Sequence, residues 1–132
     1  SPIEVYNEGR MRRDFTYVDD IVEGLVRVTM LRPGGNPDWR GENPDPGTSY
    51  APYRVYNIGG SQPVNLMDFI AVLEAALGKT ADKLMRPLQP GDVVETCADA
   101  ADLEQATGFR PQVGIETGIP RFVDWYREYY GL

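Results

Sequence analysis

A proline- and glycine-rich stretch from residue 32 to residue 52 constrains the fold of this chain more than any other feature. Asn-Pro, Pro-Asp, Gly-Gly and Pro-Gly pairs crowd it, and no hydrophobic periodicity is visible there. Because such pairs favour turns, we expect an exposed loop of roughly 20 residues, which is longer than compact domains usually contain. Strands and helices are therefore restricted to the segments on either side. The 132 residues suit a single domain built from those two segments.

The segment before this loop predicts two strands and a helix. Ile3 to Tyr6 and Asp14 to Val18 have the composition and alternation of strands. A helix is predicted from about Asp20 to Leu31, with Asp19 or Asp20 as its N-terminal cap. The apolar stripe that we expect this helix to bury consists of Ile21, Val22, Leu25, Val26 and Val28.

The segment after the loop alternates between predicted strands and helices. Asn65 to Leu77 has apolar residues at helical spacing and ends at Gly78, which suits a left-handed helix end. The other predicted elements are a strand at 53–58, a strand at 84–88, a helix from Asp99 to Thr107 and a last helix from near Ile115 to Tyr130. Pro120 either kinks the last helix or moves its start to about Ile119. The alternation predicts an α/β fold.

Composition excludes several classes of function. The net charge of -7 argues against nucleic acid as a partner, because a phosphate backbone requires a basic face. No apolar run approaches the length of a membrane span, so we expect no membrane partner. The chain has no histidine, which argues against a metal site. The single cysteine, Cys97, fits a reducing compartment, and we expect a cytoplasmic protein and a half-buried, unreactive thiol.

Three arginines close together in this acidic chain, Arg10, Arg12 and Arg13, require an explanation. A guanidinium group matches phosphate oxygens in geometry and stays charged at any relevant pH. Neighbouring residues on a strand point in opposite directions, so either Arg12 or Arg13 could face a given ligand. The alternative is a solvated strand edge, or an ion pair with Asp19 or Asp20.

Two further features allow a ligand-binding interpretation beside a structural one. Asp92, in the turn Gln89-Pro90-Gly91-Asp92, could accept two sugar hydroxyls, or could serve only the turn. Tyr6 could stack on a flat base, or could be an ordinary core residue. A carboxylate site made of Asp92, Glu95, Asp99 and Asp102 is rejected, because Asp99 and Asp102 suit a helix start.

Four motifs in order resemble the extended short-chain dehydrogenase/reductase family, in particular the nucleotide-sugar 4-epimerases that act on UDP-glucuronate. The motifs are Gly9 to Gly24 (GRMRRDFTYVDDIVEG), Tyr53 to Gly59, Pro87 to Val93 and Arg121 to Tyr126. The similarity spans nearly the whole chain except the 32–52 loop. It implies that residues 1–132 are one domain, the C-terminal substrate-binding region of such an enzyme, without its NAD-binding Rossmann core. The start at Ser1-Pro2, without an initiator methionine, agrees with part of a longer chain.

The resemblance also implies which part of such an enzyme binds NAD and carries the catalytic residues. In this family the N-terminal part carries a glycine-rich NAD loop and a catalytic Tyr-x-x-x-Lys. Neither Lys79 nor Lys83 follows a tyrosine by four residues, and no glycine fingerprint is present. We therefore expect no catalytic residue and no bound NAD on this chain, which would be inactive alone, although the full-length parent would use NAD. The family reaction oxidises the sugar at C4, turns the keto sugar and returns the hydride to its other face.

Residue by residue, the resemblance implies a site for the UDP part of the substrate. Ile3, Val5 and Tyr6 match the strand beside the uracil, with Tyr6 at the stacking position. Arg13 matches the arginine that contacts the diphosphate, and Asp92 matches the acid that accepts the ribose hydroxyls. Gln89 stands where some relatives have a diphosphate-binding arginine, and Thr96 where some have a tyrosine near the sugar. Within the same resemblance, a nucleotide-sugar dehydratase or decarboxylase, or a non-catalytic binding module, remains an alternative. The sugar and the oligomeric state are left open.

Overall fold

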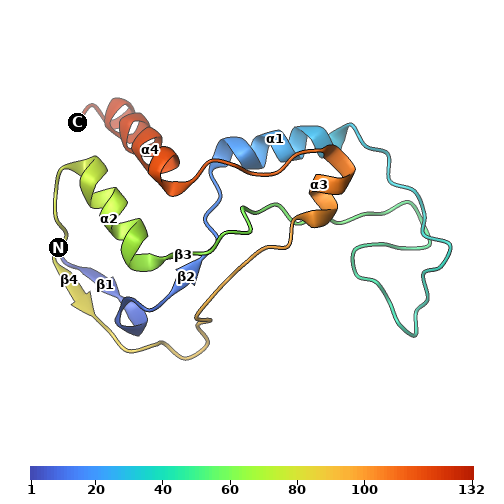
Figure 1. Cartoon of the computed structure of the whole chain (residues 1–132), viewed down its shortest axis with the longest axis horizontal. Coiled ribbons are helices and arrows are strands. Elements are labelled where there is room, and N and C mark those ends of the chain that lie inside the picture. Colours follow the sequence, from blue (N-terminus) through green and yellow to red (C-terminus); the bar gives the residue numbers. More distant parts are fainter.

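The computed structural model describes residues 1–132 as four α-helices, four short strands and one 3-10 helix (Figure 1). In chain order these are β1 (Ile3–Val5), η1 (Tyr6–Gly9), β2 (Arg12–Arg13), α1 (Val18–Thr29), β3 (Val64–Asn65), α2 (Leu66–Leu77), β4 (Lys83–Met85), α3 (Ala101–Thr107) and α4 (Ile115–Tyr130). Helices α2 and α4 lie at one end with β1 and β4. Helices α1 and α3 lie in the middle, and the loop region extends at the other end (Figure 1). The mixture of helices and strands confirms the expected fold class.

The strands form two separate two-stranded sheets. β1 pairs in parallel with β4, with Val5 opposite Met85, and β2 pairs antiparallel with β3, with Arg13 opposite Val64. A single bridge adds Glu95 beside Arg12. These pairings bring the N-terminal segment next to residues 83–96, although the two are distant in sequence.

The core lies between α2 and α4. Ile115, Ile119 and Val123 follow one another at four-residue spacing on α4 and are all buried. Phe69 and Leu73 of α2 pack against them, together with Phe15, Val64, Val72 and Ala76. The helical periodicity of α2 is thus confirmed, and so is its left-handed end at Gly78, where φ is +67°.

Helix α4 is one helix that begins at Ile115 and contains Pro120 in its interior. Pro120 lies in the second turn, where its missing N–H removes one intrahelical hydrogen bond. Gly118, in the same turn of α4, allows the Tyr17 ring to approach the helix closely, because a Cβ at residue 118 would lie 2.8 Å from Cδ2 of Tyr17. The predicted helix from near Ile115 to Tyr130 is therefore confirmed, and the alternative start at about Ile119 is wrong.

Two of the expected strands are absent. Residues 14–17 continue from β2 without regular structure, because the Asp14 carboxylate binds backbone N–H groups of two other segments in place of a strand partner. Residues 53–58 are not a strand either. Only Arg54 forms a bridge, to Thr48, and no strand of this chain lies beside the rest of the segment. The strand expected at 84–88 is β4, which lies one residue earlier and is shorter.

Helix α1 differs from expectation at its cap and on its apolar face. Its N-cap is Tyr17, and no side chain caps it. Asp20 is instead buried, and its Oδ2 accepts hydrogen bonds from the backbone N–H groups of Gln112 (2.9 Å) and Val113 (2.8 Å). The stripe that should be buried is largely exposed, with Val22 and Leu25 at 51% and 55%, because no other element of the chain covers it.

Residues 31–63 contain no helix or strand apart from the bridge between Thr48 and Arg54. Up to Tyr50 this loop region is ordered by its own polar contacts, and after it Arg54, Asn57 and Ser61 bind residues outside the region. Asp45 accepts hydrogen bonds from the Gly47 N–H (2.8 Å) and the Thr48 hydroxyl (2.8 Å). The Trp39 and Tyr50 rings lie 5.9 Å apart. These contacts are local, so the loop contributes little to the core.

The molecule as a whole has more surface than a compact protein of its size. Its accessible area is 9209 Å², and 14 of its residues are buried. A compact monomer of 14.8 kDa has an area of about 7,000 Å². The difference reflects the exposed apolar face of α1 and the extended loop region. Each helix is too short or too polar to span a lipid bilayer.

Candidate functional site

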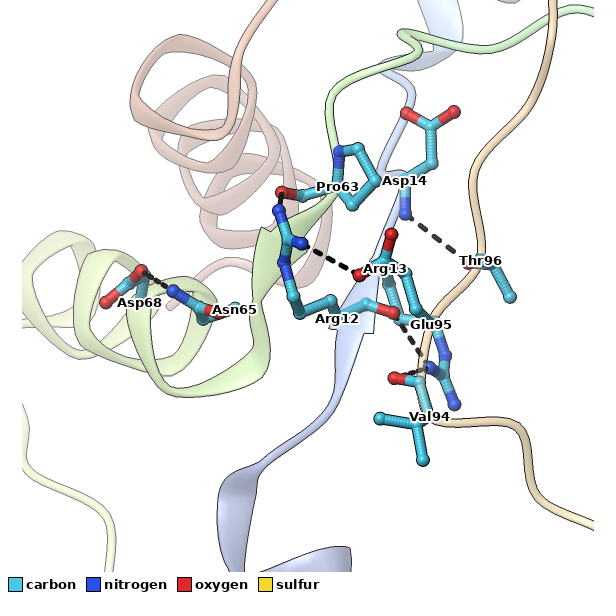
Figure 2. Close-up of polar contacts among 9 residues, drawn as sticks. All are labelled: Arg12, Arg13, Asp14, Pro63, Asn65, Asp68, Val94, Glu95 and Thr96. Carbon is cyan, nitrogen blue, oxygen red and sulfur yellow. Dashed lines mark hydrogen bonds and ion pairs between the residues drawn. The ribbon is translucent and has the colours of Figure 1, made fainter.

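The two arginines of β2 have different surroundings (Figure 2). Nη1 of Arg12 donates to Oε2 of Glu95 at 2.8 Å, and Nη2 donates to the carbonyl of Pro63 at 3.0 Å. The charge of Arg12 is thus compensated within the chain. This arginine links β2 to two other segments and is not available for a ligand.

Arg13 has no carboxylate partner. Its Nη1 donates to the carbonyls of Arg12 (2.8 Å) and Val94 (3.1 Å), and none of the ion pairs of the chain includes it. The alternative of an ion pair with Asp19 or Asp20 is wrong, since Asp19 is 3.9 Å from Arg121 and Asp20 is buried at backbone N–H groups. Two carbonyls thus orient the Arg13 guanidinium, and no carboxylate of the chain neutralises its charge.

Asp14 holds three segments together directly beside Arg13. Its carboxylate accepts hydrogen bonds from the backbone N–H groups of Ser61 (3.0 Å) and Ala98 (2.9 Å). Its own N–H donates to Oγ1 of Thr96 at 3.4 Å (Figure 2). Gly59 makes this approach possible, because a Cβ there would lie 2.4 Å from Cβ of Ala98. The predicted site residue Thr96 thus lies beside Arg13, and its hydroxyl takes part in the scaffold.

The turn at residues 89–92 is formed as predicted. The Asp92 N–H donates to the Gln89 carbonyl at 3.2 Å, and Gly91 has a φ of +89°. The side chains of Gln89 and Asp92 are exposed, and Asp92 has no ion-pair partner.

Tyr6 follows directly after β1, and its hydroxyl donates to Oε2 of Glu4 at 2.6 Å. Oε1 of Glu4 accepts from Nε (3.1 Å) and Nη2 (2.9 Å) of Arg86. The hydrogen bond to Glu4 is the main cause that raises the pKa of Tyr6, and the same bond is the main cause that lowers the pKa of Glu4. Sequence reasoning missed both Glu4 and Arg86. The two-residue spacing of Glu4 and Tyr6 on a strand was the available signal.

The two aliphatic residues of β1 are placed differently from each other. Ile3 is 39% exposed, but Val5 is 1% exposed. The Val5 side chain is one of the most buried in the chain, and the expectation that Val5 lies beside the uracil stays a prediction. The Val5 carbonyl is also occupied, because it accepts a hydrogen bond from the Arg86 N–H at 2.9 Å.

The glycine-rich turn at residues 59–62 does not fit a dinucleotide phosphate. At 59–62 the N–H groups of Ser61 and Gln62 already point at the Asp14 carboxylate. A second anion beside that carboxylate would be repelled. No group of three acidic or sulfur ligands is placed to hold a metal ion, and the Cys97 thiol is exposed, not half-buried. The arrangement thus presents one uncompensated arginine, an exposed acid and an aromatic ring, which suits binding better than covalent chemistry.

Comparisons with known proteins agree with this picture. Protein CapI of Staphylococcus aureus is 54% identical over 128 residues, and a Rhizobium meliloti (strain 1021) protein named "Probable UDP-glucuronate 4-epimerase" is 47% identical over 130 residues. These matches cover 97% and 98% of this chain and 38% of each relative. No family model matches. The chain thus spans 38% of the length of these relatives.

Solved structures of similar fold also match nearly all of this chain. The UDP-glucuronic acid 4-epimerase of Bacillus cereus, in complex with UDP-glucuronic acid and NAD, matches with a TM-score of 0.73 and 26% identity. MoeE5, in complex with the same two molecules, matches with a TM-score of 0.76 and 26% identity. The matches cover 98% of this chain and 36% and 38% of those chains.

Proposed function

We propose that this chain belongs to the UDP-glucuronate 4-epimerase family as its C-terminal part, and that it supplies the UDP-binding half of an NAD-dependent nucleotide-sugar epimerase. The observation that carries the proposal is the Arg13 guanidinium, which is fixed by two carbonyls and has no carboxylate partner. Its charge is available for the diphosphate of a nucleotide sugar, in a chain with net charge -7. The proposed substrate is UDP-glucuronate or a related UDP-hexose.

Each predicted residue then has a role at one part of the UDP. The Tyr6 ring stacks on the uracil, and Ile3 lies beside it. Asp92 accepts the ribose hydroxyls, because its exposed carboxylate is free of other partners. Gln89 makes a neutral and therefore weaker contact to the diphosphate than an arginine would. Thr96 lies nearest to the sugar.

The chain contributes binding and orientation, and the chemistry belongs to residues elsewhere in a longer enzyme. NAD supplies the hydride chemistry in such an enzyme, and the turn at 59–62 is unsuited to hold it. Holding the remote UDP part fixes where the hexose can lie while it turns, so that binding energy positions the reacting carbon. We therefore propose binding without turnover for the 132-residue chain.

The remainder of such an enzyme would cover the exposed apolar face of α1, formed by Val18, Val22, Leu25 and Val26. This occupant is favoured because the chain spans 38% of its relatives and has about 2,000 Å² more surface than a compact protein of its mass. The same part would pair with residues 53–58, which have strand composition but no neighbouring strand here.

Titration of UDP into the 132-residue chain, followed by NMR, tests the proposed site. Arg13→Ala should weaken binding by about 10- to 100-fold, because a charged hydrogen bond contributes roughly 1.5–3 kcal/mol. Arg10→Ala is the matched control, since Arg10 is an exposed arginine of the same cluster whose side chain contacts only the Asn7 carbonyl. Binding that Arg13→Ala leaves unchanged, or that Arg10→Ala weakens equally, would contradict a specific diphosphate contact.

A further inference from the structure

Glu4, Tyr6 and Arg86 form one continuous hydrogen-bonded chain across the paired strands β1 and β4, which we name the phenol clamp. We propose that Glu4 and Arg86 are positioning residues that fix the Tyr6 ring for stacking on the base, so that the site prefers a uridine nucleotide over a bare diphosphate. The inference rests on the proposed UDP site. It assigns a role in that site to two residues that do not themselves contact the ligand.

The phenol clamp begins with the geometry of β1. Glu4 and Tyr6 are two residues apart, so their side chains leave the strand on the same side. The 2.6 Å bond from the Tyr6 hydroxyl to Oε2 of Glu4 therefore lies on one face of the strand. A phenol held at its hydroxyl keeps its ring in one orientation, whereas a free tyrosine samples several rotamers.

The backbone fixes the far end of the phenol clamp. Arg86 follows β4 directly, and its N–H donates to the Val5 carbonyl at 2.9 Å. Its carbonyl accepts from the Glu8 N–H at 3.0 Å. Arg86 is thus attached on both sides of Tyr6, and its guanidinium reaches Oε1 of Glu4 through two nitrogens. Glu4 is held from one side by a fixed arginine and holds the phenol on the other.

The backbone after Tyr6 also restricts the ring. Asn7 and Glu8 have φ values of 51° and 53°, in the left-handed region that non-glycine residues rarely adopt. Gly9 follows with a φ of +76°, and a Cβ there would lie 2.7 Å from Sδ of Met67. The chain therefore forms a tight turn directly after Tyr6.

Electrostatics keep the phenol clamp intact at neutral pH. The Tyr6 bond lowers the pKa of Glu4, and the same bond raises the pKa of Tyr6, so the carboxylate stays ionised and the phenol stays protonated. The Glu4–Arg86 pair is about half exposed, and such pairs contribute little to stability. We expect the Glu4–Arg86 pair to strengthen UDP binding instead, because a Tyr6 ring that is already ordered loses less entropy when the base stacks on it.

The test compares UDP with inorganic diphosphate on the same 132-residue chain by NMR titration. Glu4→Gln and Arg86→Met should weaken UDP binding by about 2- to 10-fold, the cost of one freed side chain, and change diphosphate binding less than twofold. Tyr6→Phe keeps the aromatic ring but removes its hydrogen bond to Glu4, and should weaken UDP binding by the same factor. Glu23→Gln is the matched control, because it opens the Glu23–Arg27 pair, which is equally exposed but lies on α1.

The outcomes separate this inference from the proposed function. UDP binding that depends on Arg13 but not on Glu4 would overturn the phenol clamp alone. Equal weakening of UDP and diphosphate by Glu4→Gln would also overturn it, since that marks a general loss of structure. A Glu4→Gln/Tyr6→Phe double variant with additive losses would show two independent contributions and would refute the clamp. UDP binding that is absent, or indifferent to Arg13, would refute the proposed function itself.

Discussion

Two adjacent carboxylates at the start of α1 show how differently single residues contribute. Asp20 is 8% exposed, and its Oδ2 accepts two backbone hydrogen bonds from the segment that precedes α4. Asp19 is exposed and lies 3.9 Å from Arg121. A buried acceptor must be satisfied, whereas an exposed one is solvated by water. Asp20 therefore joins α1 to α4, and Asp19 does not.

Replacing these two residues by asparagine separates their roles. Asp20→Asn should lower the free energy of unfolding by about 1–3 kcal/mol, because a neutral amide oxygen accepts weaker hydrogen bonds from the two N–H groups. Asp19→Asn should change it by less than about 0.5 kcal/mol. Urea denaturation followed by circular dichroism measures both. Similar losses for the two variants would show that Asp20 does not act through its buried contacts.

The residues of the candidate site were only partly predictable. Arg13 is conspicuous as a positive residue in an acidic chain, but the choice between Arg12 and Arg13 depends on Glu95 and Pro63, which only the fold brings to Arg12. Arg86 was not predictable. Its contact with Glu4 spans 82 positions and requires the parallel pairing of β1 and β4, which leaves no pattern in the sequence.

At the scale of the elements, one carboxylate connects α2 to the β-structure. Oε1 of Glu74 accepts hydrogen bonds from Nζ of Lys83, the first residue of β4, and from the Ala81 N–H at 2.7 Å. The bond from Lys83 is the main cause that lowers the pKa of Glu74 from its ordinary value of 4.5. The contact thus fixes the return of the chain from α2 into β4.

This contact predicts a pH dependence of stability. The pKa of Glu74 is lower in the folded state than in the unfolded state, so the ionised carboxylate stabilises the fold fully above about pH 4.5. That contribution is lost as the pH falls through the lower, folded-state value. Glu74→Gln should therefore reduce the acid-induced fall in melting temperature between pH 6 and about pH 3. Glu128→Gln, which removes an exposed carboxylate of α4 with no hydrogen-bond partner, should leave the pH profile unchanged. Parallel profiles for wild type and Glu74→Gln would contradict the assignment.

The helices were predicted more closely than most of the strands, because helices form from local interactions. Helix α2 follows from the spacing of its apolar residues and from Gly78, and both act within one helix. Residues 53–58 have equally clear β-composition, but a strand exists only beside a partner strand, and this chain offers none. The apolar stripe of α1 was identified correctly, but the prediction that it is buried was wrong. The reason is again that no other element of this chain lies beside it.

At the scale of the whole molecule, the exposed apolar face of α1 dominates. Val18, Val22, Leu25 and Val26 are all about half exposed on one helix. Apolar patches of this kind on a soluble chain mark a contact surface. In isolation the face is open to other copies of the chain and to apolar dyes.

A charged double variant tests this face. Val22→Glu/Leu25→Glu should reduce dye binding and concentration-dependent self-association several-fold without loss of helix content, because both side chains are already half in water. Val72→Glu is the matched control, since Val72 packs against the core and the same change there should unfold the chain. Sedimentation and fluorescence of a hydrophobic dye measure the effect. Unfolding of the double variant would show that the α1 face is buried in solution.

The contact between Gly59 and Ala98 limits how the sequence can change over time. The two residues share a space in which a single added methyl group at Gly59 would lie 2.4 Å from the methyl group of Ala98. Position 59 can therefore accept alanine only in a lineage whose position 98 has already become glycine and in which the Asp14 carboxylate, 2.9 Å from the added methyl group, has shifted. A sequence that took the steps in the reverse order would first separate the two segments that Asp14 joins. Substitution at position 98 must therefore precede substitution at position 59.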